Sequence, residues 1–271
     1  MPSGAELTQP AIDVHHRMEG RQGAPVLVLS HAMGASMATW DPQATTLSRD
    51  FNLLRYDHRG HGGSPVPAGP YTIADLGRDL VRLLNRLELD RVSFCGISLG
   101  GMVGLWVAAN APDRIDRLMV CCSAARMMRP QDYAARAHRV RTEGMASIAD
   151  AVIGRWFTPA FAARRPETVA SIRALLLSTP AEGYAGACEA LAMMDLRNDL
   201  PRIDTPTLVI AAAEDQSTPP EQSREIAGRI KGAKLIVIPG AAHLANVEQP
   251  EAVTNHILDH VTKGGRRHEP R

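Results

Sequence analysis

The sequence predicts an α/β fold whose mainly parallel sheet is interrupted by a helical insertion. Short apolar runs alternate with segments of helical periodicity in the first and last parts of the chain. Between residues 123 and 200 this alternation gives way to helical patterns broken by prolines. Strands separated by helices form parallel βαβ units with helices on both faces of the sheet. A length of 271 residues accommodates one such domain with an insertion.

The first part of the chain contains two predicted helices. Residues 72–89 form the first, because apolar side chains recur at positions 73, 76, 80, 83, 84 and 87 and Thr72 can cap the N-terminus. The second runs from Leu99 to Asn110 and ends before Pro112. Four apolar runs in the same part are predicted strands: 25–30, 51–57, 91–97 and 115–122.

The last part of the chain returns to the alternating pattern. Strands are predicted at 207–213 and 234–239, and helices at 219–230 and 251–261. A tail with four Lys or Arg residues against one Glu follows, and this composition is typical of a solvated end. The predicted units are a core formed by residues 1–122 and 201–262, a helical cap at 123–200 and a flexible basic tail at 263–271.

Composition and charge describe an ordinary globular protein without a strong charge bias. Thirty basic and 29 acidic residues give a formal net charge of +1, which provides no strong field for nucleic acid or an acidic membrane. No apolar run of about 18 residues and no basic, apolar leader is found, so we expect neither a membrane span nor export. The four cysteines lack metal-ligand or CxxC spacing, which indicates a reduced, cytoplasmic protein. These features do not predict an oligomeric state.

The most informative motif is Gly96-Ile97-Ser98-Leu99-Gly100, a G-x-S-x-G sequence. An apolar strand ends at Ile97 and a helical pattern begins at Leu99, which is the setting of a nucleophile elbow. Side chains at positions 96 and 100 would collide with the backbone of so tight a turn. A turn that cradles a phosphate is the alternative, but neither GxGxxG nor GxxxxGK[ST] is present. Ser98 is therefore the candidate nucleophile.

A nucleophilic serine needs a base, and the base needs a carboxylate that orients it. In chain order these partners follow the serine, each after a late strand. His243 follows the strand at 234–239 and is the candidate base, although a loop histidine bonded locally is the plain alternative. Asp215 follows the strand at 207–213 and is favoured as the carboxylate over the adjacent Glu214 or a simple capping role.

Attack on a carbonyl creates an oxyanion that needs two N–H donors. We expect one from the backbone of Leu99, directly after the nucleophile. The other should come from the loop after the strand at 25–30, where Met33 is favoured over Ala32. The remaining histidines lack the spacing of a metal site, and His58 and His61 are expected to shape a Gly-rich turn.

These residues resemble the α/β-hydrolase superfamily, and further stretches resemble the 3-oxoadipate enol-lactonases of bacterial aromatic catabolism. The resemblance covers roughly residues 10 to 262. The first loop departs from it, because His31-Ala32-Met33-Gly34 stands where an Asn-Ser-Leu-Gly-like stretch is expected. The stretches that carry the resemblance are residues 54–80, 94–104, 155–161 (RWFTPAF), 183–188 (GYAGAC), 194–197 (MDLR) and 241–250 (AAHLANVEQP).

The resemblance implies an α/β-hydrolase fold and hydrolysis of 3-oxoadipate enol-lactone to 3-oxoadipate in the β-ketoadipate pathway. It implies a serine acyl-enzyme, with no metal and no organic cofactor. A related esterase or lactonase for another small ester, or a non-catalytic binding protein on the same scaffold, are the alternatives.

The implied substrate carries a free carboxylate, which needs a cationic or amide partner. Trp156 is the first candidate for the substrate pocket, but packing within the insertion is an equally good interpretation. The same holds for Tyr184, Met193 and Met194. The arginines of the insertion that are candidates for the carboxylate are Arg126, Arg129, Arg155, Arg164, Arg165 and Arg197.

Overall fold

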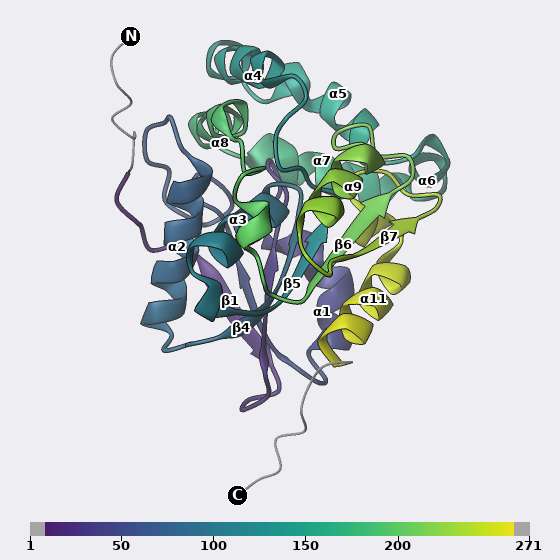
Figure 1. Ribbon diagram of the computed structural model, residues 1–271. Coiled ribbons are helices and arrows are strands. Elements are labelled where there is room, and N and C mark those ends of the chain that lie inside the picture. The colour runs from purple at the N-terminus through teal and green to yellow at the C-terminus, as the bar shows by residue number, and fades with distance from the viewer. Residues whose placement is uncertain (1–8, 263–271) are drawn as a thin grey trace, which may run out of the picture.

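The computed structural model describes residues 9–262, and within them seven strands form a single sheet in the order β1-β3-β2-β4-β5-β6-β7. All neighbouring strands run parallel except β1, which pairs antiparallel with β3. The α/β fold with a mainly parallel sheet is thus confirmed (Figure 1). The strands are β1 (His16–Gly20), β2 (Val26–Ser30), β3 (Asn52–Tyr56), β4 (Val92–Ile97), β5 (Ile115–Cys121), β6 (Thr207–Ala212) and β7 (Lys234–Ile238).

Burial explains which strands were predictable. Every residue of β4 and β6 is buried, and most of their residues are apolar, as expected for parallel strands covered on both faces. The edge strand β1 has the sequence HRMEG and is only half-buried. It was not predicted, because a short polar strand at an edge has neither an apolar run nor a clear alternation.

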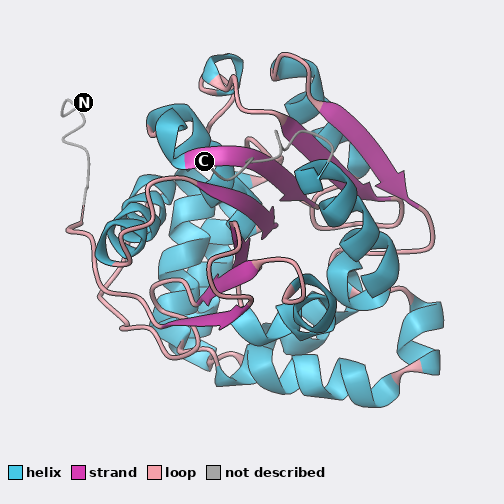
Figure 2. Cartoon of the chain, turned by 90° about the horizontal axis from the view of Figure 1, so that it is seen from below, coloured by secondary structure: helices cyan, strands magenta, loops and turns pink. Residues whose placement is uncertain are grey.

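Helices cover both faces of the sheet (Figure 2). On one face α1 (Asp41–Leu47) packs against α11 (Pro250–Thr262). On the other face α2 (Ile73–Arg86) packs against α3 (Leu99–Asn110), and α9 (Pro220–Arg229) covers β6 and β7. The short helical segments are η1 (Met37–Trp40), η2 (Pro112–Arg114), η3 (Leu200–Arg202) and α10 (Ala245–Glu248).

Helix α2 shows how the local sequence sets these boundaries. Thr72 accepts a hydrogen bond from the Asp75 N–H, and the Asp75 carboxylate accepts one from the Thr72 N–H, which forms a capping box. Ile73, Leu76, Leu80 and their neighbours form the buried stripe that faces α3. The helix predicted for this region is therefore confirmed, with ends shifted by one to three residues.

Five helices between β5 and β6 form a layer over the carboxyl ends of the parallel strands (Figure 1). We call α4–α8 the helical layer. Its strongest internal packing joins α4 to α8. The division into core and cap stays a prediction, and the predicted basic tail, 263–271, lies outside the described residues. The helices of the layer are α4 (Pro130–Glu143), α5 (Ala146–Trp156), α6 (Pro159–Arg164), α7 (Pro166–Ser178) and α8 (Ala181–Met193).

Candidate active site

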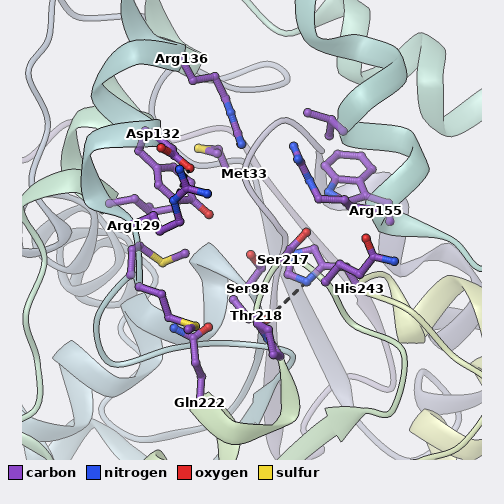
Figure 3. A pocket seen from close by; sticks show the side chains of 18 of the residues that line it. Met33, Ser98, Arg129, Asp132, Arg136, Arg155, Ser217, Thr218, Gln222 and His243 are labelled. Carbon is purple, nitrogen blue, oxygen red and sulfur yellow. Dashed lines mark hydrogen bonds and ion pairs between the residues drawn. The ribbon is translucent and has the colours of Figure 1, made fainter.

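Ser98 occupies a strained turn between β4 and α3. Its backbone has φ 55° and ψ −117°, a left-handed conformation that is uncommon for a residue other than glycine. A Cβ atom at Gly96 would lie 2.3 Å from the backbone of Gly100, and one at Gly100 would lie 2.3 Å from the carbonyl oxygen of Ser30. Both glycines of the motif are therefore required, and the turn directs Ser98 toward the helical layer (Figure 3).

Asp215 and His243 meet beyond the ends of β6 and β7. The His243 Nδ1 atom lies 2.8 Å from Asp215 Oδ2, and both side chains are buried. The other carboxylate oxygen, Oδ1, accepts hydrogen bonds from the backbone N–H groups of Ser217 (2.8 Å) and Thr218 (3.0 Å). The Thr218 hydroxyl also donates to Oδ2 at 2.8 Å. These donors hold the carboxylate in one orientation, so that it selects the imidazole tautomer with the proton on Nδ1.

The neighbouring Glu214 is exposed and contacts the imidazole through no hydrogen bond among the described residues. Of the two candidate carboxylates, the fold brings Asp215 to the histidine.

Ser98 and His243 line the same pocket (Figure 3). Within residues 9–262 no hydrogen bond joins the Ser98 hydroxyl to the imidazole, and Nε2 has no protein partner there. Catalytic hydrogen bonds are commonly long before substrate binds and shorten in the complex. The arrangement therefore places a hydroxyl and an available imidazole nitrogen at one surface of the cavity.

The pocket has a volume of about 290 Å³ and lies between the sheet and the helical layer. Met33, Trp156 and Tyr184 line it, as does Arg155. Arg129 also lines it, but this side chain forms an ion pair with Asp132 at 3.1 Å. The sequence-based candidates that are not among the lining residues are Arg126, Arg164, Arg165, Arg197, Met193 and Met194.

The arginine candidates predicted from the sequence did not include Arg136 on α4, which also lines the pocket. In Figure 3 the guanidinium groups of Arg136 and Arg155 point from different helices into the same space above Ser98. Among the described residues neither arginine forms an ion pair with Asp or Glu, and Arg136 stacks on the Tyr133 ring at 4.9 Å. Burial, followed by the positive charge of Arg136, lowers the pKa of Arg155. Two half-buried cations that repel each other are well suited to an anion.

Two backbone N–H groups near Ser98 are available as donors. In the part of the chain that the structure describes, the amides of Leu99 and Met33 have no acceptor. Leu99 is the first residue of α3, where amides are free of helical bonds. Met33 lines the pocket, whereas Ala32 is buried away from it.

Buried histidines hold the loop that carries Met33. His61 Nε2 accepts a hydrogen bond from the Gly34 N–H at 3.0 Å, and His31 Nε2 accepts one from the His58 N–H at 3.1 Å. Burial lowers the pKa of His61 to about 3 and also lowers that of His31. Both rings are therefore neutral and can accept these bonds. The shaping role predicted for the Gly-rich turn agrees with these contacts, whereas the contribution of His31 was not foreseen.

Residues 9–262 contain no cluster of His, Cys, Asp and Glu side chains arranged to hold a metal ion. Over the same range, none of the helices combines the length and the apolar character needed to cross a bilayer.

Comparisons with known proteins agree with this architecture. A family model described as alpha/beta hydrolase fold matches residues 25–250. A 3-oxoadipate enol-lactonase 2 of Acinetobacter baylyi (strain ATCC 33305 / BD413 / ADP1) is 38% identical, over 95% of this chain and 96% of its own. The crystal structure of the enol-lactonase from Burkholderia xenovorans LB400 superposes with a TM-score of 0.90 at 43% identity, covering 92% of this chain and 96% of that one.

A further relative is not named as an enol-lactonase. RutD of Stutzerimonas stutzeri (strain A1501), provisionally named as a carbamate hydrolase, is 32% identical over 92% of this chain and 97% of its own. The family model, the relatives and the sheet topology lead to one conclusion: the chain belongs to the α/β-hydrolase fold family, and its relatives include 3-oxoadipate enol-lactonases.

Proposed function

We propose that this protein is a serine hydrolase that opens a small enol-lactone carrying a free carboxylate. The expected reaction is conversion of 3-oxoadipate enol-lactone to 3-oxoadipate, in the β-ketoadipate pathway of aromatic catabolism. One observation carries the choice of substrate class: the guanidinium groups of Arg136 and Arg155, which form no ion pair with Asp or Glu among the described residues, share the pocket with Ser98 and His243. The names of the enol-lactonase relatives support the same choice.

In the proposed first step His243 Nε2 removes the hydroxyl proton of Ser98 while Oγ bonds to the lactone carbonyl carbon. The negative charge moves to the carbonyl oxygen, which accepts hydrogen bonds from the Leu99 and Met33 N–H groups. Collapse of this intermediate breaks the bond from the acyl carbon to the ring oxygen, and the enolate leaves. The imidazolium returns its proton to the enolate, which is a better leaving group than an amine.

Water then completes the reaction. His243 takes a proton from water, hydroxide adds to the acyl carbon, and the Ser98 oxygen leaves with the proton from the imidazolium. The Asp215 carboxylate keeps the imidazole in the required tautomer and stabilises its charge throughout.

The substrate carboxylate is proposed to bind between Arg136 and Arg155. A carboxylate there would neutralise two cations that otherwise repel each other, and charge-assisted hydrogen bonds of this kind are strong. Trp156 is proposed to form part of the apolar wall of the same pocket.

The test is loss of the ultraviolet absorbance of the authentic enol-lactone, measured with the wild-type protein and with Ser98→Ala. We expect rapid turnover by the wild type and a loss of up to about 10⁶-fold in the variant, with an unchanged circular dichroism spectrum. A serine-directed phosphonate should label Ser98 in the wild type only. Folded protein that fails to react with the phosphonate would exclude every serine mechanism, and the non-catalytic binding protein would then be favoured.

A second candidate uses the same residues on a different small substrate. The relative named as a carbamate hydrolase supports it, since a carbamate also has a carbonyl open to attack by serine. Turnover of p-nitrophenyl acetate or of a carbamate, with none of the enol-lactone, would favour this candidate.

A further inference from the structure

Backbone hydrogen bonds hold the turn that carries His243 on both sides of the histidine. The Leu244 N–H donates to the carbonyl oxygen of Trp156 at 3.0 Å. The Ala242 N–H donates to Glu248 Oε2 at 2.9 Å. Because the residues before and after His243 are both held, the main chain at the histidine has little freedom to move.

Glu248 links this turn to the segment after α5. Its carboxylate accepts hydrogen bonds from the Thr158 hydroxyl and from the Thr158 N–H, the latter at 3.3 and 3.4 Å to the two oxygens. Glu248 is 5% exposed and Thr158 is 6% exposed. Every partner of the carboxylate is a donor, and none of them is a Lys or Arg side chain among the described residues. A buried carboxylate is stable only when its oxygens are hydrogen-bonded in this way.

Thr158 follows α5, and the last two residues of that helix, Arg155 and Trp156, line the pocket. The bonds at Ala242, Leu244 and Thr158 therefore join the histidine turn and the end of α5 into one unit. Glu248 itself is not among the residues that line the pocket.

We propose that Glu248 is a positioning residue, which fixes the His243 imidazole relative to Ser98 and to the end of α5. The proposal rests on the proposed function insofar as His243 is the base. Misplacement of a catalytic group by about 1 Å can cost on the order of 100-fold in rate. Release of the Ala242 and Thr158 bonds is therefore expected to reduce turnover while leaving substrate binding intact.

The experiment compares four variants on two substrates, the enol-lactone and the neutral ester p-nitrophenyl acetate. Glu248→Gln replaces one acceptor oxygen by an N–H₂ group that faces donors. Thr158→Val removes the hydroxyl at nearly constant volume, whereas Thr158→Ser keeps it. Glu251→Gln, at an exposed position on α11, controls for the loss of one negative charge. Each variant is assayed well below its unfolding midpoint.

Glu248→Gln should lower kcat by about 10- to 100-fold on both substrates, with KM changed by less than about twofold. Thr158→Val should lower kcat less, and Thr158→Ser and Glu251→Gln should match the wild type. Wild-type kcat in folded Glu248→Gln would overturn the proposal. Equal losses in Thr158→Ser and Thr158→Val would also overturn it, because the hydroxyl would then be irrelevant.

A loss of kcat confined to the enol-lactone would also overturn the proposal. Glu248 would then act through the pocket side chains Arg155 and Trp156 and not through His243. The activity of Ser98→Ala distinguishes failure of the proposed function from failure of this inference. If the proposed function were wrong, Ser98→Ala would retain turnover, whereas failure of this inference alone leaves Ser98→Ala inactive and Glu248→Gln active.

Discussion

Replacing Arg155 by Gln removes one of the two arginine cations that face the pocket and leaves Ser98, Asp215 and His243 unchanged. A hydrogen bond to a charged group is worth about 1.5–3 kcal/mol. At about 1.4 kcal/mol per factor of ten, the variant should lose about 10- to 150-fold in kcat/KM on the enol-lactone. The neutral ester p-nitrophenyl acetate has no carboxylate, so its kcat/KM should stay within about twofold of wild type.

Without substrate, the same substitution should leave the stability of the protein unchanged or increase it. The charge of Arg136 contributes to the lowered pKa of Arg155, so the two cations repel each other when no anion is bound. Arg155→Gln removes this repulsion, and its unfolding midpoint should be equal to or higher than that of the wild type. Loss of activity together with unchanged or greater stability distinguishes a binding residue from a packing residue.

The matched control is Arg165→Gln, an exposed arginine of the helical layer that does not line the pocket. It should leave both substrates unaffected. The reasoning would be refuted if Arg155→Gln had wild-type kcat/KM on the enol-lactone. It would equally be refuted if the variant lost as much on the neutral ester, because the guanidinium would then act on Ser98, Asp215 or His243 and not on the substrate carboxylate.

Two further predictions concern the carboxylate beside His243 and the buried ring of His61. Asp215→Asn should lower kcat by about three to four orders of magnitude, because the amide favours the wrong tautomer, and Glu214→Gln should be silent; the reverse result in steady-state assays would reassign the carboxylate. The folded pKa of His61, about 3, lies below the unfolded value of 6.5, so stability present above pH 6.5 is lost as pH falls toward 3. At pH 5.5 the contribution of His61 to the free energy of unfolding is smaller by about 1 kcal/mol. Urea midpoints should show a smaller pH dependence in His61→Gln than in the exposed control His138→Gln.

The nucleophile turn could be predicted because its signals are local. The strand before Ser98, the glycines at 96 and 100 and the helix that follows are contiguous in sequence, and the observed α3 has the predicted ends. The positions of Asp215 and His243 follow from a general property of parallel sheets, whose strands end at one common edge. Their hydrogen bond agrees with that expectation.

The edge strand β1 and the pairing of Arg136 with Arg155 could not be predicted from the local sequence. Nothing in the local sequence distinguishes Arg136 from the other arginines of the helical layer, because on a helix each of them reads as a solvated charge. Arg126 and Arg197 were equally plausible, and both lie away from the pocket, near Asp195. Which cation faces the cavity depends on how α4 and α5 are placed over the sheet.

The sequence by itself therefore determined the α/β class, the order of its strands and helices along the chain, and the three side chains at the carboxyl edge of the sheet. These depend on periodicity and on short-range turn chemistry, which act within a few residues. The tertiary structure alone decided the pairing of Arg136 with Arg155 and the attachment of Glu248 to Thr158, which is 90 residues away in sequence. Such contacts form between helix faces and turns whose relative placement is set by packing of the whole chain, and no local pattern encodes that placement.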